Sequence, residues 1–158
     1  MTEIRPDGNS IRCRDAVEAD AETIVAFQLR MARETEEVEL DGETCRRGVR
    51  SVFADPSLGR YFIAEAGGKV VGSLLITFEW SDWRARTVWW IQSVFVDESM
   101  RRRGVYASLY AHVREIVDAD DTIAGVRLYV DRRNRPAQLV YERLGMSGEH
   151  YLVYEWMK

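Results

Sequence analysis

The spacing of apolar residues along the chain predicts strands and helices in a fixed order. Alternating or continuous apolar runs predict strands over Ile11–Val17, Tyr61–Glu65, Val70–Trp80, Thr87–Val96, Val126–Val130 and Tyr151–Met157. Apolar residues spaced three and four apart predict helices over Glu18–Glu36, from Asp41 to the stop at Asp55–Pro56, from Gly104 to Val117 and over Asn134–Leu144. The predicted order is β-α-α-β-β-β-α-β-α-β.

Short connections between the middle strands define the sheet. Ala66–Lys69 contains adjacent glycines between two apolar runs, which is typical of a hairpin. Too few residues separate Val70–Trp80 from Thr87–Val96 for a crossover helix, so these strands are antiparallel. We therefore expect an α/β (α+β) fold with a mixed, mainly antiparallel, twisted sheet of about 6–7 strands flanked by about 4 helices. Because no repeat or linker interrupts the pattern, one domain is expected over residues 11–158, after a short N-terminal extension over residues 1–10.

Composition and charge narrow the function classes. The chain has 158 residues, 46% hydrophobic and 30% charged, which fits one domain with a packed core. Its net charge of −4 disfavours nucleic acid as a partner, because such a surface repels phosphates. Residues 1–10 carry charges and no apolar run, so no secretory signal is expected and the protein is predicted to be cytoplasmic. No membrane contact is expected either, since the most apolar stretch, Thr87–Val96, is too short to span a bilayer as a helix.

The cysteines predict neither a metal site nor a covalent intermediate. Cys13 lies in the first predicted strand and Cys45 on a helix, with no Cys or His near either at metal-ligand spacing. We therefore expect no zinc site, no disulfide and no acyl-enzyme on cysteine.

The junction between the strand ending at Val96 and the helix beginning at Val105 is the most informative stretch. It holds Arg101–Arg103 and then Gly104. Unpaired amides and the positive end of the helix dipole meet at such a junction, and glycine lets an anion approach the backbone closely. The alternative is a solvated basic turn, but the position between strand and helix favours a phosphate or diphosphate site.

Two motifs in the C-terminal half resemble the GNAT superfamily of acetyl-CoA-dependent N-acetyltransferases. The first is Arg101-x-x-Gly104, which departs from the family pattern at Tyr106, where Gly or Ala is usual. The second is Asn134-x-x-Ala-x-x-x-Tyr141 followed by Gly145. The order of elements over residues 11–158 extends the resemblance.

The resemblance implies a cofactor site for acetyl-CoA. In the family, the fourth and fifth strands of the sheet splay apart. The resemblance implies that backbone groups of Val94 and Val96 pair with the pantetheine arm in this gap, and that amides of residues 102–107 hold the diphosphate. The implied cofactor-binding residues are Val94, Phe95, Val96, Arg101, Arg102, Arg103, Gly104, Val105, Tyr106, Ala107, Asn134 and Tyr141.

The two side chains named in the second motif, Asn134 and Tyr141, also have structural interpretations. The Tyr141 hydroxyl is implied to lie near the thioester sulfur, where it can give a proton to the leaving thiolate as a general acid. The alternative for Tyr141 is a core residue with a hydrated tip. Asn134 is implied to contact the cofactor arm, and it is equally suited to cap the helix.

A narrower resemblance, to the polyamine and thialysine acetyltransferase branch, rests on residues 72–83 and 89–96. That branch has a carboxylate pair where this chain has Gln92 and Ser93. An alkylammonium must lose a proton before attack, and Gln92 cannot accept it. Gln92 is therefore interpreted as holding a water that carries the proton away, or as a strand residue with a structural role. A carboxylate such as Glu34, Glu79 or Asp82 is the alternative base. The candidate substrate residues are the acidic and aromatic side chains Glu34, Glu79, Trp80 and Asp82, for which solvated helix ends and core or dimer packing are the alternatives.

Two functions follow, from different classes. The first is transfer of an acetyl group from acetyl-CoA to a primary amine of a small molecule or peptide, by direct attack in a ternary complex, with Tyr141 and Gln92 as catalytic residues. The second is a non-catalytic module of the same fold that binds or senses acyl-CoA. The acidic charge argues against a third, an RNA-binding sandwich. A homodimer is an assembly common in the branch that the chain resembles.

Overall fold

The computed structural model describes residues 10–158, which group into two compact units, one ending at Arg127 and the other spanning Leu128–Lys158. The predicted N-terminal extension therefore lies outside the described residues, apart from Ser10. The expectation of one domain over residues 11–158 stays a prediction, and each unit is described by itself.

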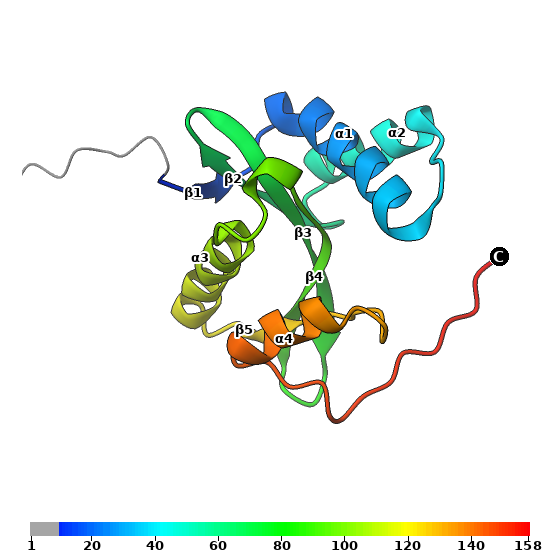
Figure 1. Cartoon of the computed structure of the whole chain (residues 1–158). Coiled ribbons are helices and arrows are strands. Elements are labelled where there is room, and N and C mark those ends of the chain that lie inside the picture. The colour runs from blue at the N-terminus through cyan, green and yellow to red at the C-terminus, as the bar shows by residue number, and fades with distance from the viewer. Residues whose placement is uncertain (1–9) are drawn as a thin grey trace, which may run out of the picture. The chain divides into compact units, whose positions relative to one another are not determined.

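The first unit is built on one mixed sheet of five strands in the order β1-β2-β3-β4-β5 (Figure 1). Its strands are β1 (Arg12–Asp15), β2 (Arg60–Ala66), β3 (Lys69–Ser81), β4 (Arg86–Val96) and β5 (Ile123–Arg127). The first four form an antiparallel meander, and β5 runs parallel to β4. Gly67 and Gly68 both adopt positive φ and make the tight turn between β2 and β3, as the sequence predicts.

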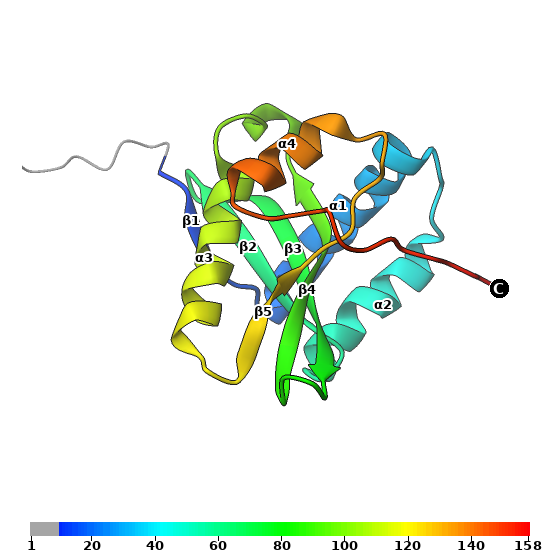
Figure 2. The same ribbon diagram turned by 90° about the horizontal axis from the view of Figure 1, so that it is seen from below.

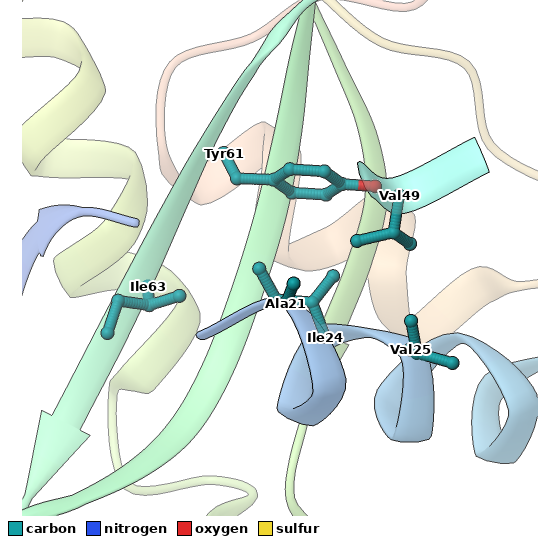
Figure 3. Packing of buried hydrophobic residues seen from close by; sticks show 6 residues of the cluster. All are labelled: Ala21, Ile24, Val25, Val49, Tyr61 and Ile63. Atoms are coloured by element: carbon teal, nitrogen blue, oxygen red, sulfur yellow. The ribbon is translucent and has the colours of Figure 1, made fainter. Parts of the chain in front are cut away.

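Helices cover both faces of this sheet (Figures 1 and 2). Helices α1 (Ala21–Met31) and α2 (Gly42–Ala54) lie on one face, and α3 (Val105–Ala119) lies on the other. Figure 3 shows the core on the α1 and α2 face, where the Tyr61 ring of β2 reaches across to Val49 of α2. On the opposite face, Phe62 of β2 contacts His112 of α3 edge to face, with ring centroids 5.4 Å apart.

The predicted helix over Glu18–Glu36 is a composite. It begins as a 3-10 turn over Glu18–Asp20, continues as α1, and ends as a π-helical turn over Ala32–Glu36. Glu37 terminates it in the left-handed conformation, with φ of 55°. The helix that follows starts where the sequence predicts, because the Asp41 carboxylate accepts a hydrogen bond from the Thr44 amide at 2.8 Å.

The second unit contains α4 (Arg135–Arg143), framed by the two residues that the sequence analysis singled out. The Asn134 side chain accepts a hydrogen bond from the Ala137 amide at 3.2 Å and caps the start. Gly145 has φ of 84°, and the Gly145 and Met146 amides donate to the carbonyls of Glu142 and Tyr141. This Schellman arrangement satisfies carbonyl groups at the end of the helix.

Two strand predictions need correction. The strand predicted over Val126–Val130 is observed as Ile123–Arg127, because the ladder starts where Thr87 pairs with Ile123. The strand predicted over Tyr151–Met157 is absent from the described residues, so the sheet has five strands rather than about 6–7. Its alternating pattern is present, but a strand also needs a ladder, and these residues belong to none. In residues 10–158 there is also no helix with the length and apolar composition that crossing a membrane requires.

Candidate functional site

The second half of β4 has a partner strand on one side only, within the part of the chain that the structure describes. The parallel ladder between β4 and β5 ends at the pair Trp90 and Arg127. Residues 91–96 continue beyond it and pair with β3 alone. The other edge of this half-strand can therefore offer backbone groups to a ligand.

A β-bulge reshapes the same half of β4. Gln92 pairs with Leu75 and Phe95 pairs with Ser73, so Ser93 and Val94 stand opposite one residue of β3. Ser93 has φ of 51°, in the left-handed region. In a regular strand, residues three positions apart point to opposite faces of the sheet. Because of the bulge, Gln92 and Phe95 instead lie on the same face, the one that α1 and α2 cover. The Phe95 ring stacks on Phe27 of α1, with centroids 4.7 Å apart.

The turn after β4 leads into the uncapped start of α3. Gly104 occupies the N-cap position with φ of 81°, and no side chain caps the helix there. The first backbone bond of α3 runs from the Ser108 amide to the Gly104 carbonyl, at 2.9 Å. The amides of Val105 and Ala107 precede it and have no acceptor within the helix. Nothing lies within 4 Å of a Cβ built on Gly104, so the space beside the start of the helix is open at this residue.

Arg101 ties this turn to the π-helical turn that follows α1. Its Nε donates to the Val96 carbonyl at 3.1 Å, and its guanidinium forms an ion pair with Glu34. Beside it, Arg30 pairs with Asp97 at 3.0 Å, and hydrogen bonds from Ser99 and Arg30 lower the pKa of the Asp97 carboxyl. These charges fix the strand end and the helix end against each other.

A pocket of about 270 Å³ lies at this junction, and we call it the β4 pocket. Its wall contains four of the predicted cofactor-binding residues, Val94, Phe95, Val96 and Arg101, together with the predicted substrate residue Glu34. The structure thus brings these residues together. Arg102 and Arg103 are exposed on the adjoining turn.

Gln92 lies on the α1 and α2 face in a row with Leu75 of β3 and Tyr61 of β2. Its amide nitrogen donates to the Thr77 hydroxyl at 2.5 Å. This bond orients the side chain and leaves the carbonyl oxygen as the group that can accept a hydrogen bond.

The predicted substrate residues are not gathered in one place. Glu79, Trp80 and Asp82 lie toward the tip of the β3–β4 hairpin, whereas Glu34 lines the β4 pocket. Because Trp80 pairs with Thr87, roughly 20 Å of strand separates it from Val94. Glu79 accepts hydrogen bonds from Trp90 at 3.0 Å and Arg127 at 2.9 Å, and these bonds lower the pKa of its carboxyl. Trp80 is 67% exposed.

In the second unit, Tyr141 is half-buried on α4. Burial raises the pKa of its hydroxyl, so the phenol stays protonated at neutral pH and can donate a proton. Asn134 acts as the N-cap, which is the structural role weighed for it in the sequence.

Comparison with known proteins shows the family. Residues 21–146 match the model described as the acetyltransferase (GNAT) family. This chain belongs to that family. No curated protein matches the sequence.

Solved structures of GNAT proteins and others share the fold. A "possible acetyltransferase" from Clostridium difficile 630 is 39% identical over 94% of this chain and 97% of its own, with a TM-score of 0.87. An aminoglycoside N-acetyltransferase in complex with CoA is 16% identical, covers 98% of this chain and 99% of its own, and has a TM-score of 0.78. A transcriptional regulator from Bacillus halodurans C-125 is 19% identical, covers 94% and 100%, and has a TM-score of 0.79. At 16% and 19% identity, the likeness is one of fold.

GNAT enzymes use acetyl-CoA as acyl donor. The turn before α3 has the features that the diphosphate of this cofactor needs, namely amides without helical acceptors, an open glycine and exposed arginines. Tyr106, which departs from the family motif, lies in the first turn of α3, and its ring is tilted against Tyr110 with centroids 6.3 Å apart.

The sequence analysis missed a second pocket, of about 390 Å³, between α1, α2, β2 and β3. We call it the α1–α2 pocket, and its walls include Gln28, Cys45, Gly48, Val52, Tyr61 and Leu75. The available signal was Gly48, which interrupts the apolar stripe of α2 with a residue that fills no space. An apolar stripe on a helix predicts core packing, and the walls of a pocket are apolar as well. The sequence pattern of α2 therefore could not distinguish a pocket from a core.

Proposed function

We propose that this chain transfers the acetyl group of acetyl-CoA to a primary amine of a small molecule or peptide, by direct attack in a ternary complex. One observation carries the proposal: a half-free, bulged β4 ends at the open, uncapped start of α3. This arrangement offers a strand edge for an extended arm next to amides for a diphosphate. Cys13 and Cys45 lie outside the β4 pocket, in agreement with transfer that needs no acyl-enzyme.

The cofactor is proposed to be held by three parts of the chain. Amides of residues 102–107 and the side chains of Arg102 and Arg103 bind the diphosphate. Backbone groups of Val94 and Val96 pair with the pantetheine arm, and Asn134 contacts the same arm. Arg101 donates to the Val96 carbonyl, so it fixes the orientation of the peptide group at the end of β4. When bound, acetyl-CoA supplies a thioester carbonyl that a neutral amine can attack.

Proton transfer is assigned to Gln92 and Tyr141. The Gln92 carbonyl accepts a hydrogen bond from a water that takes the proton of the amine. Glu79 is a weak base, because hydrogen bonds from Trp90 and Arg127 lower the pKa of its carboxyl, and Glu34 is held in an ion pair with Arg101. The Tyr141 hydroxyl, protonated because burial raises its pKa, gives its proton to the departing thiolate.

The acceptor is proposed as a primary amine without restriction to polycations. The likeness to the polyamine and thialysine branch depends on the sequence of residues 72–83 and 89–96. Three of the four residues that would attract a cation, Glu79, Trp80 and Asp82, lie far along the hairpin from Glu34. A homodimer and a cytoplasmic location stay predictions.

A non-catalytic acyl-CoA-binding module is the second candidate. It is favoured by Gln92, which stands where the resembling branch has a carboxylate, and by the ion pairs that occupy Glu34 and Glu79.

The two functions separate in one experiment. The full chain is incubated with acetyl-CoA and a panel of primary amines, and release of free thiol is followed. If the chain is the proposed enzyme, thiol release depends on the amine. The rate of release also rises with pH, because the ammonium group, with a pKa of about 10, loses its proton. A CoA-induced rise in Tm without release for any amine contradicts the enzyme and supports the sensor.

A further inference from the structure

We propose that the α1–α2 pocket binds the body of the acceptor, and that the acceptor is a primary amine with one apolar group and one hydrogen-bond-accepting oxygen. This inference rests on the proposed function, since it names the substrate of the same site. It distinguishes an apolar monoamine from the polycations suggested by the sequence.

The first argument is the size and lining of the pocket. At about 390 Å³ it falls in the range of about 300–1,000 Å³ found for small-molecule sites. Leu40, Val52 and Leu75 give it apolar walls. Asp41 is the single charged lining residue among the described ones, and its carboxylate is engaged by the Thr44 amide. A polyamine needs several carboxylates, which this pocket does not provide.

The second argument is an unsatisfied polar group. Gln28 lines the pocket, is 8% exposed, and has no hydrogen-bond partner for its amide nitrogen in the described chain. A buried donor without a partner is unfavourable, so it selects a ligand with an acceptor oxygen. The Tyr61 hydroxyl is also present, and burial raises its pKa to about 12, so it is neutral at physiological pH.

The third argument is the position of the pocket relative to Gln92. Tyr61, Leu75 and Gln92 are paired across β2, β3 and β4, so their side chains lie on the same face of the sheet. Neighbouring strands are about 4.8 Å apart, which puts the pocket wall at Leu75 one strand from Gln92 and the wall at Tyr61 about 10 Å away. An amine at Gln92 can therefore extend a body of that length into the pocket.

The test compares amines that differ in one feature. Phenylalaninamide carries the amine, an aromatic group and a carbonyl oxygen. Alaninamide lacks the aromatic group, 3-phenylpropylamine lacks the oxygen, and spermidine is a polycation. We expect the KM for phenylalaninamide to be at least about 10-fold below that of the other three. Equal KM values for all four, or preference for spermidine, would overturn the proposal.

Variants locate the effect in the pocket. A Cβ on Gly48 meets nothing within 4 Å, so Gly48→Leu fills the pocket without a backbone clash. We expect Gly48→Leu and Gln28→Leu to raise the KM for phenylalaninamide at least about 10-fold and to leave the CoA-induced rise in Tm unchanged. Gly42→Leu is the matched control, because Gly42 also lies in α2 with open space but does not line the pocket. An equal KM in Gly42→Leu and Gly48→Leu contradicts the proposal.

A labelling experiment separates this proposal from the proposed function. Cys45 lines the pocket and Cys13 does not, and both are half-buried free thiols. In the full chain with CoA, phenylalaninamide is expected to slow alkylation of Cys45 by iodoacetamide and leave Cys13 unchanged, as read by mass spectrometry. Protection of Cys45 without thiol release for any amine means that the pocket proposal stands and the enzyme fails. Thiol release with phenylalaninamide but no protection of Cys45 means the reverse.

Discussion

Helices α2 and α3 begin in opposite ways. At the start of α2, a carboxylate from Asp41 is built into the chain and accepts the Thr44 amide at 2.8 Å. At the start of α3, Gly104 offers no side chain, and the preceding residues are arginines. Both starts have the same unpaired amides and the same positive dipole. The chain satisfies one with its own carboxylate and supplies no side-chain cap to the other, and the proposed cofactor site rests on this missing cap.

The largest effect is expected from replacing Gly104, the residue that leaves the start of α3 without a side-chain cap. Gly104→Val puts a β-branched residue at φ of 81°, a conformation that costs about 1–2 kcal/mol for residues with a Cβ, and fills the approach to the amides. We expect the Kd for CoA to rise more than about 100-fold, measured by calorimetry. An unchanged Kd in a folded variant would remove this turn from the cofactor site.

Tyr141→Phe separates binding from chemistry. If the uncapped start of α3 binds the cofactor and Tyr141 only donates a proton, the variant lowers kcat by about 100-fold and leaves the Kd for CoA unchanged. Stopped-flow thiol release and calorimetry on the same preparation measure both quantities. Equal kcat in wild type and variant removes Tyr141 from the mechanism.

Asp41→Ala is the converse change at α2. We expect Tm to fall by a few °C while the Kd for CoA stays the same, because this cap stabilises the fold and touches no cofactor. Hydrogen bonds from Thr44 lower the pKa of Asp41 below its usual value of 3.8. Its stabilisation is therefore complete above about pH 4 and is lost as pH falls through the lowered pKa. In thermal melts, a Tm difference from wild type that does not shrink as the pH falls from about 4 towards about 2 contradicts the cap.

The smallest expected effect is at the middle of α2. Gly48 lies in a helix interior with no atom within 4 Å of an added Cβ, so Gly48→Ala is expected to stabilise the chain by about 0.5–1 kcal/mol. Urea unfolding measures it. Destabilisation would mean that the space beside Gly48 is not open, which also bears on the α1–α2 pocket.

The local pattern was sufficient for most of the fold. Alternation and helical spacing predicted the first four strands and the four helices, and the strand, basic turn and glycine before Val105 predicted the open start of α3. Caps could be predicted because Asp41 and Asn134 act within three residues of their own positions.

What the sequence missed depends on distant partners. The bulge at Ser93 involves pairing with β3, and no glycine or proline marks it. The ion pair of Glu34 with Arg101 joins residues 67 positions apart. The pattern at Tyr151–Met157 is strand-like, yet a strand exists only where another segment completes the ladder. The α1–α2 pocket could not be predicted for a related reason, since its walls combine α1, α2, β2, β3 and the residues just before α2.

The most direct test of the uncapped start of α3 is the affinity for CoA compared with that for pantetheine, which has the same arm but no diphosphate. Calorimetry on the wild-type chain should give a Kd for CoA at least about 100-fold lower than that for pantetheine, and Gly104→Val should abolish most of this difference. Equal Kd values for CoA and pantetheine in the wild-type chain would contradict the account.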